Sequence, residues 1–240
     1  MISPANLIKR VGAGGGVVPF LKCVCVYFAV GGFGGGVSAD APSAMLVAAK
    51  CAPVVCLLLA VLFHHGSSYN PQGWYARRIA LGLALSAVGD ALLLFPQYFL
   101  WGMCAFGAAH CAYIAAFGLR PRSPLMAIAC YAPAAIFVRD WLEPPASLRT
   151  AVAAYAALLA TMGWRGVVQA TTRRANGRSG ACALFLGSLM FLLSDAILGY
   201  SLFGRPGHLP YKQLLVMSTY YAAQLGIAMS VLQTPRTVSH

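Results

Sequence analysis

The sequence predicts an all-α protein that crosses a membrane eight times. Of its 240 residues 60% are hydrophobic and only 9% are charged, and the mean hydropathy is +0.72. A soluble domain carries far more charge. Eight apolar segments come close to the roughly 20 residues that a helical span needs, and none alternates in polarity as the strands of a membrane barrel do. We therefore expect a single integral membrane domain over residues 1–240.

Breaks at Pro, Gly and Arg clusters separate the eight predicted helices. The first follows Lys9 and Arg10, lacks a clear cleavage site and is expected to stay in the membrane as the insertion signal. All eight cysteines lie inside the spans, so we expect small buried apolar side chains rather than a disulfide scaffold. The predicted helices cover about 17–36, 43–63, 79–95, 99–117, 124–137, 148–164, 180–203 and 214–232.

The net charge of +12 is explained by topology. If the N-terminus is cytosolic, the cytosolic segments hold Lys9, Arg10, Arg77, Arg78, Arg120, Arg122, Arg165, Arg173, Arg174, Arg178 and Arg236. The other side holds only Arg139, Arg149, Arg205 and Lys212. This asymmetry follows the positive-inside rule and predicts that both termini are cytosolic. The basic side chains then face anionic lipid, so no nucleic-acid partner is expected.

Only two of the five acidic residues fall inside predicted helices. Asp40, Asp140 and Glu143 lie in connections, whereas Asp90 lies in SAVGDALLLF and Asp195 in FLLSDAILGY. A charge at a helix centre costs ~2.5–3.5 kcal/mol on insertion scales, so it usually faces the bundle interior and has a partner. The two aspartates are expected about 16 and 22 Å from the cytosolic ends of their helices. At these depths, in the outer half of the membrane, the two carboxyls can meet.

Other polar side chains are expected at the depth of the aspartates. These supporting candidates are Lys50, Ser86, His110, Tyr113, Ser194, Tyr220, Tyr221 and Gln224. Some share a helix face, because Ser86 precedes Asp90 by four residues and Tyr113 follows His110 by three. Each also has a structural interpretation, since an intramembrane His or Gln can join helices and Lys50 can reach the membrane surface or neutralise an aspartate. The common depth favours a functional layer.

A faint internal repeat relates the two aspartates, which are 105 positions apart. AVGDALLLF, followed by a helix with HCAYIAAF, resembles LLSDAILGY, followed by a helix with TYYAAQLGIA. Four spans separate the copies, so two four-helix repeats are expected to be parallel and to share a site between them. An enzyme and a proton-coupled transporter both fit this arrangement, whereas a lipid-binding scaffold would tolerate loss of the carboxyls. From the residues alone, enzyme and transporter stay open.

Motifs for other chemistries are absent. The GAGGG segment near the start lacks the lysine and the context of a phosphate-binding loop. No HExxH or paired-cysteine pattern predicts a zinc site, and there is no GxSxG elbow. We therefore expect no metal, and acid–base chemistry by two carboxyls.

Six stretches of the chain form a more specific combination. They are KCAP at 50–53, GLALSAVGDALLLF at 82–95, GAAHCAYIAAFG at 107–118, MGWR at 162–165, FLLSDAIL at 191–198 and MSTYYAAQ at 217–224. Together they resemble the YhhN-like lysoplasmalogenase family, and its animal members in particular. The resemblance covers almost the whole chain from the first helix to the eighth and is weakest at residues 139–149 and in both tails.

The resemblance implies hydrolysis of the vinyl ether bond of a lysoplasmalogen to a fatty aldehyde and a glycerophosphoethanolamine or glycerophosphocholine. It implies that Asp90 and Asp195 are the family's two characteristic aspartates, that no cofactor is needed, and that the membrane is that of the endoplasmic reticulum or a related organelle.

The chemistry agrees with the two buried carboxyls. Protonation of the terminal alkene carbon creates an oxocarbenium ion that water captures. Burial and mutual repulsion both oppose a second negative charge, so the pair can keep one proton, much as the two carboxyls of glycosidases do. The sequence leaves open which aspartate is the acid.

Overall fold

The structure, a computed structural model, describes residues 17–31, 42–65, 71–173, 178–205 and 209–233. These parts of the chain contain eight α-helices, one short 3-10 helix and no strand, so the all-α prediction is confirmed. In chain order they are α2 (Val17–Gly31), α3 (Ala44–His65), α4 (Pro71–Leu92), η1 (Pro96–Tyr98), α5 (Phe99–Phe117), α6 (Pro124–Trp141), α7 (Ala146–Arg173), α8 (Arg178–Phe203) and α9 (Lys212–Leu232).

Several helices extend beyond their predicted ends. α4 begins at Pro71 rather than near Ile79, and α7 continues to Arg173 rather than ending near Trp164. Both added parts contain arginines and glutamines, so hydropathy alone does not detect them, whereas Pro71 suits the first turn of a helix because that position needs no backbone donor. The predicted residues 32–36 of the first helix lie outside the described residues.

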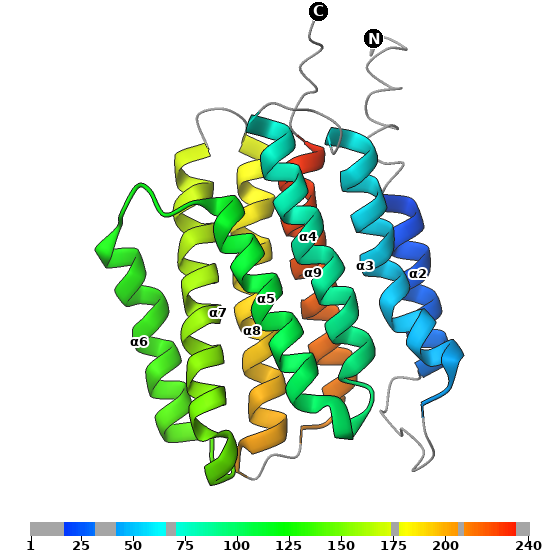
Figure 1. The fold of residues 1–240 in the computed structure, drawn as a ribbon, viewed down its shortest axis with the longest axis vertical. Coiled ribbons are helices and arrows are strands. Elements are labelled where there is room, and N and C mark those ends of the chain that lie inside the picture. Colours follow the sequence, from blue (N-terminus) through cyan, green and yellow to red (C-terminus); the bar gives the residue numbers. More distant parts are fainter. Residues whose placement is uncertain (1–16, 32–41, 66–70, 174–177, 206–208, 234–240) are drawn as a thin grey trace, which may run out of the picture.

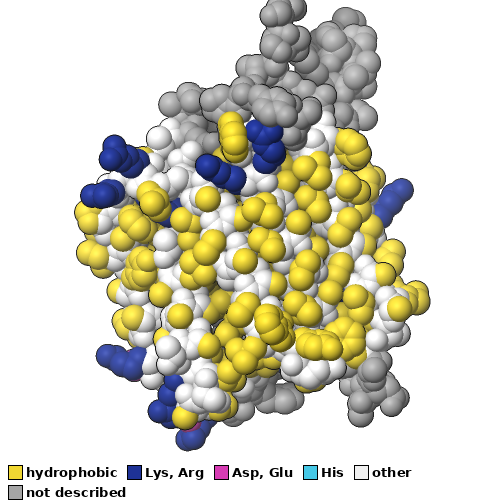
Figure 2. All heavy atoms as spheres, viewed as in Figure 1, with side chains coloured by type: hydrophobic (Ala, Val, Ile, Leu, Met, Phe, Trp, Pro, Cys, Tyr) yellow, Lys and Arg dark blue, Asp and Glu magenta, His cyan; other side chains and the backbone are white. Residues whose placement is uncertain are grey.

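The chain is a multi-pass membrane protein. Five segments are long and apolar enough to cross a membrane: α3, η1 with α5, α7, α8 and α9. α2 is apolar but shorter. Figure 2 shows a broad hydrophobic band, with lysines and arginines mainly at the two ends of the molecule. Side chains such as Phe63, which is 80% exposed, and Trp101, which is 68% exposed, require an apolar solvent outside the bundle.

Successive α-helices run antiparallel (Figure 1). We call the end of the bundle that holds Val17 and Leu232 the near end, and the end that holds Gly31 and Lys212 the far end. The pairs α4–α5 and α8–α9 pack most extensively, with α3 beside α4 and α9, and α7 beside α8 and α5. α2 packs on α3, and α6 packs on α7, so these two helices are outermost (Figure 1).

The crossing of α8 and α9 depends on two glycines. A Cβ atom on Gly187 would lie 2.8 Å from the backbone nitrogen of Ile227, and one on Gly226 would lie 2.5 Å from the carbonyl oxygen of Ala183. Small residues let two membrane helices approach this closely. Nearer the far end, the Ser194 hydroxyl donates to the carbonyl of Val216 at 3.1 Å, which fixes the next turns of the same helix pair.

The prediction that the cysteines are buried is wrong, because four of them are exposed and the other four are only half-buried. All eight are free thiols. Cys25, Cys104, Cys111 and Cys182 are exposed, and they lie on helix faces that a membrane would cover. A thiol is apolar enough for lipid as well as for a protein core, so an apolar run cannot say which of the two it meets.

The assignment of Arg165 to a cytosolic segment is also wrong. Arg165 lies inside α7 and is fully buried. Its guanidinium donates to the carbonyl oxygens of Gly118, at 2.5 Å, and Pro121, at 2.8 Å. This arginine therefore fastens the connection between α5 and α6 to α7.

Candidate active site

A cavity of about 1350 Å³ occupies the far half of the bundle. Residues from every helix α2–α9 line it, and most of them are apolar. Lys50, Asp90, Tyr155, Asp195 and Tyr220 are among its polar walls. Ligand pockets commonly have volumes of about 300–1,000 Å³ and mostly apolar walls with a few polar groups. This cavity is therefore large enough for a lipid-sized ligand.

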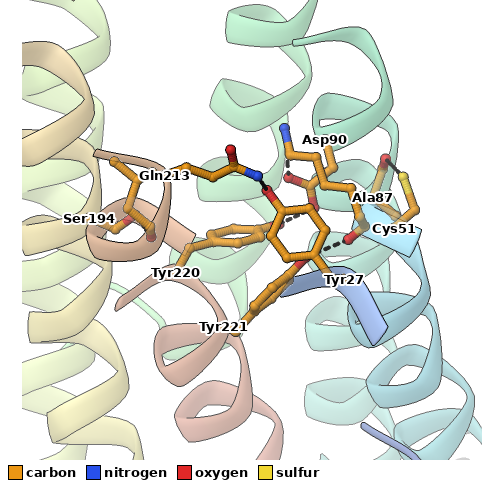
Figure 3. A network of polar contacts seen from close by, with 10 residues as sticks. Tyr27, Cys51, Ala87, Asp90, Ser194, Gln213, Tyr220 and Tyr221 are labelled. Atoms are coloured by element: carbon orange, nitrogen blue, oxygen red, sulfur yellow. Dashed lines mark hydrogen bonds and ion pairs between the residues drawn. The ribbon is translucent and has the colours of Figure 1, made fainter. Parts of the chain in front are cut away.

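Asp90, near the end of α4, has two partners. Its Oδ1 atom lies 3.8 Å from the ammonium of Lys50 on α3. Its Oδ2 atom accepts a 2.6 Å hydrogen bond from the hydroxyl of Tyr220 on α9. Asp90 is 2% exposed and Lys50 9%, so Lys50 does not reach the membrane surface. Figure 3 shows Tyr220 reaching Asp90 from α9.

Asp195, on α8, has a different environment. Its Oδ2 atom accepts a 2.6 Å hydrogen bond from the hydroxyl of Tyr155 on α7. The same hydroxyl lies 3.1 Å from Nε2 of His110, and that nitrogen is 3.7 Å from Asp195. The Asp195 side chain is 12% exposed and lines the cavity. Asp195 thus has a tyrosine and a histidine nearby, whereas Asp90 has a tyrosine and a lysine.

The two carboxyls share one cavity but not one partner. They interact electrostatically, and no hydrogen bond joins them within the described parts of the chain. Two carboxyls that line one largely apolar cavity, with a lysine against only one of them, resist being ionised together. The arrangement can therefore hold one carboxylate and one carboxylic acid in an apolar environment.

Three other predicted residues pack around this site without lining the cavity. The Tyr113 hydroxyl donates to Oε1 of Gln224 at 2.7 Å, and the Tyr221 hydroxyl donates to the carbonyl of Lys50 at 2.8 Å. All three are buried, and none lines the cavity. The Tyr221 bond holds the backbone that carries Lys50, so we regard it as a positioning contact.

The two predicted serines have structural roles and do not contact the carboxyls of the site. Ser86 is fully buried on α4 beside Tyr113. Ser194 lines the cavity, but its hydroxyl donates to the backbone of α9, as described above.

Tyr155 is the principal residue that our sequence analysis missed. It is the only polar side chain in the segment AVAAYAALLA. It lies nine residues after the start of α7, which corresponds to a depth of about 14 Å from the far end. Asp195, eight residues before the end of α8, lies at about 12 Å by the same arithmetic. The depth argument that selected His110 and Tyr220 would have selected Tyr155 as well.

Tyr27 and Gln213 form a second missed pair, closer to the far end. Gln213 donates to the Tyr27 hydroxyl at 2.9 Å (Figure 3). Both residues line the cavity. Tyr27 comes from the short helix α2, and Gln213 lies at the start of α9. Their positions at helix ends resemble ordinary membrane-interface residues, so the sequence contained no signal that distinguished them.

Within the described residues, no group of three or more His, Cys, Asp or Glu side chains is placed to hold a metal ion.

Comparison with known proteins identifies close relatives. Residues 45–231 match the model of the YhhN family. Lysoplasmalogenase TMEM86B of Homo sapiens is 38% identical over 222 residues, which cover 90% of this chain and 86% of the relative. Lysoplasmalogenase TMEM86A of Homo sapiens is 35% identical over 251 residues, which cover 100% of this chain and 97% of the relative. No solved structure matches the chain with statistical significance.

Proposed function

This chain belongs to the YhhN family, and on that premise we propose that it is a lysoplasmalogenase. The names of the relatives support this reaction, because the similarity extends over nearly the whole of both chains. One observation carries the proposal to particular residues: Asp90 and Asp195, from two different helices, line the same largely apolar cavity. The enzyme hydrolyses the vinyl ether bond of an alkenyl glycerophosphoethanolamine or glycerophosphocholine to a fatty aldehyde and the glycerophospho head group.

The reaction needs one proton donor, one water molecule and a group that tolerates positive charge. A carboxylic acid gives its proton to the alkene carbon further from the ether oxygen, and the double bond becomes an oxocarbenium ion. Water adds to the carbon next to that oxygen and loses a proton, which leaves a hemiacetal. Cleavage of the hemiacetal releases the aldehyde and the alcohol of the glycerol. General acid catalysis of this kind typically contributes ~10²–10⁴-fold.

Asp90 is the carboxylate of the pair in this proposal. Both of its oxygens have partners that stabilise a negative charge: the Lys50 ammonium at 3.8 Å and the Tyr220 hydroxyl at 2.6 Å. A buried charge persists only when it is paired and hydrogen-bonded. A fixed carboxylate of this kind stabilises the oxocarbenium ion and accepts the proton of the attacking water.

Asp195 is the proton donor. No lysine or arginine contacts it among the described residues, and Tyr155 contacts only its Oδ2 atom. Oδ1 can therefore hold the proton and turn it toward a ligand in the cavity. His110 positions the Tyr155 hydroxyl and through it the carboxyl.

The two roles correspond to the two halves of an internal repeat. In our proposal the chain consists of two parallel four-helix units, α2–α5 and α6–α9, in which α4 and α8 hold equivalent aspartates. Lys50 and Tyr155, the partners of Asp90 and Asp195, are also 105 positions apart. The equivalent position thus holds a cation in one half and a neutral hydroxyl in the other. This difference separates the carboxylate from the acid.

We also propose that all eight helices cross the membrane as one domain, including the less apolar α4 and α6. α4 packs against α3, α5 and α9, and α6 packs against the longer helix α7 (Figure 1). The excess of lysine and arginine in the near-end segments supports a cytosolic near end and cytosolic termini. In an endoplasmic reticulum membrane, the organelle that the family resemblance implies, the cavity then lies in the lumenal half.

The experiment that tests the function measures aldehyde release by the purified protein. A lysoplasmalogen and its saturated ether analogue are supplied in parallel, because only the vinyl ether can be protonated at carbon. Asp90→Asn and Asp195→Asn are each expected to lower the rate at least ~10²-fold. Asp140→Asn is the matched control, since Asp140 is exposed at the far end and does not line the cavity.

Two results would count against the proposal. Retention of the rate in both cavity variants would remove the carboxyl mechanism. Failure of the well-folded wild-type protein to release any aldehyde would favour the alternative of a proton-coupled transporter that uses the same aspartates, and flux into sealed vesicles would then be measured.

A further inference from the structure

The cavity is polar at one side and apolar at the other. Lys50, Lys212 and Gln213 line it from α3 and α9. The opposite wall is formed by α6, whose lining residues are all apolar: Ala129, Cys130, Pro133, Ala134, Phe137 and Val138. α2 with α3 and α6 with α7 stand at opposite edges of the bundle in Figure 1. The polarity of the cavity lining therefore changes from cationic near α3 and α9 to apolar at α6.

The α6 wall is one continuous helix face. Cys130, Ala134 and Phe137 follow one another by four and three residues, which places them on the same side of a helix. No residue of α6 is fully buried, and Cys130, Ala134 and Phe137 are half-buried, so the protein leaves part of this face uncovered. Its neighbours across the cavity are also apolar, among them Phe99 and Met103 of α5.

The proposed proton donor, Asp195, lies close to the α6 wall. Val152, Ala156 and Leu159 line the cavity from the same face of α7 as Tyr155. Tyr155 is the hydroxyl that holds Asp195. The proton donor thus lies beside the apolar wall, whereas Asp90 lies beside Lys50, toward the cationic side.

We propose that the α6 wall is the binding site for the substrate's hydrocarbon chain, with the head group toward Lys50 and Lys212. The inference rests on the proposed function. In a vinyl ether the alkene carbon that takes the proton is on the chain side of the ether oxygen, and the carbon that becomes cationic is bonded to that oxygen. If the chain lies on α6, the carbon that takes the proton therefore faces Asp195, and the carbon that becomes cationic faces Asp90. The reverse orientation would place an alkyl chain among lysines and a charged phosphate among Phe137, Pro133 and Ala134.

Residues of the α6 wall consequently determine which chain lengths are accepted. Ala134→Trp fills the site, and Phe137→Ala enlarges it. Ile128→Trp is the matched control, because Ile128 lies on α6, is 63% exposed and does not line the cavity.

The test measures kcat/KM for a homologous series of lysoplasmalogens whose alkenyl chains lengthen in two-carbon steps. Ala134→Trp is expected to lower kcat/KM for the longest chains by roughly tenfold for every two CH₂ groups displaced, while the shortest chains react as in the wild type. Phe137→Ala should shift the optimum to longer chains. Ile128→Trp should keep the wild-type profile.

The outcome separates this inference from the proposed function. No aldehyde from any chain length in the wild type would refute the function itself. An active wild type whose chain-length profile is shared by Ala134→Trp and Phe137→Ala would overturn the inference and indicate that membrane lipid or a second copy of the chain covers α6. If Ala134→Trp does not fold, the profile of Phe137→Ala decides alone.

Discussion

Lys50 and Asp90 form an ion pair inside the bundle, with 3.8 Å between Nζ and Oδ1. The pair joins α3 to α4, and Tyr220 adds α9 by donating to the other carboxylate oxygen. Lys50 therefore has two roles in our proposal: it keeps Asp90 ionised, and it compensates a charge that the surroundings could not otherwise accommodate.

Replacing Lys50 by methionine should destabilise the protein. The variant leaves the buried carboxylate without its cation, which typically costs about 3–5 kcal/mol. The double variant Lys50→Met with Asp90→Asn should recover most of this loss, because no buried charge remains, but it should not recover turnover. Thermal unfolding in detergent and aldehyde release measure the two effects separately. A single variant as stable as the wild type would show that the pair is not the compensating interaction.

Tyr155→Phe should lower kcat with little change in folding. The substitution removes only the hydroxyl that donates to Asp195, and hydrogen bonds to charged groups contribute about 1.5–3 kcal/mol, so we expect a loss of roughly 10–100-fold. The hydroxyl fixes one carboxylate oxygen of Asp195, so its loss should lower kcat more than it changes KM. Steady-state kinetics and thermal unfolding measure the two effects.

The matched control for this variant is Tyr131→Phe. Tyr131 on α6 makes a 2.5 Å hydroxyl contact to Thr161 on α7, but it does not line the cavity. This variant should leave kcat unchanged. A kcat of Tyr155→Phe equal to that of Tyr131→Phe would assign Tyr155 a purely structural role.

Gly226→Ala should destabilise the bundle, whereas Gly107→Ala should not. The new methyl group at residue 226 would meet the backbone of α8, at Ala183 and Gly187, which cannot move aside. Overpacking of this kind typically costs about 1–3 kcal/mol. At residue 107 a Cβ has only an ordinary contact with Leu158, at 3.6 Å. The difference between the two thermal midpoints is the measurement, and equal midpoints would contradict the close α8–α9 crossing.

Arg165→Met should lower stability but leave kcat of the folded protein unchanged. The guanidinium donates to two carbonyls in the α5–α6 connection and does not line the cavity. Each carbonyl left without its partner costs about 1–3 kcal/mol when buried. Arg122→Met, at an exposed position in the same connection, is the control and should be neutral. A large fall in kcat at normal stability would show that this arginine acts on the site instead.

The two aspartates were recognisable from sequence because they are exceptions to the composition around them. A carboxyl in an apolar run is costly, so its presence alone marks a position with a partner. Tyr155 is not such an exception, since tyrosines are common in membrane helices, and it became significant only when its hydroxyl proved to lie on Asp195. The ends of α4 and α7 were missed for the related reason that polar helical turns do not differ in hydropathy from loops.

The amino-acid sequence by itself determined that the chain is helical and membrane-embedded, and placed Lys50, Asp90, His110 and Asp195 at similar depths. Depth follows from counting residues along each helix, because the rise per residue is constant. Only the tertiary structure decided which helices are neighbours, and therefore that Lys50 pairs with Asp90 while Tyr155 and His110 serve Asp195. Lateral neighbours depend on side-chain packing between segments far apart in the chain, such as the approach of α8 and α9 at Gly187 and Gly226, and counting along one helix contains no information about it.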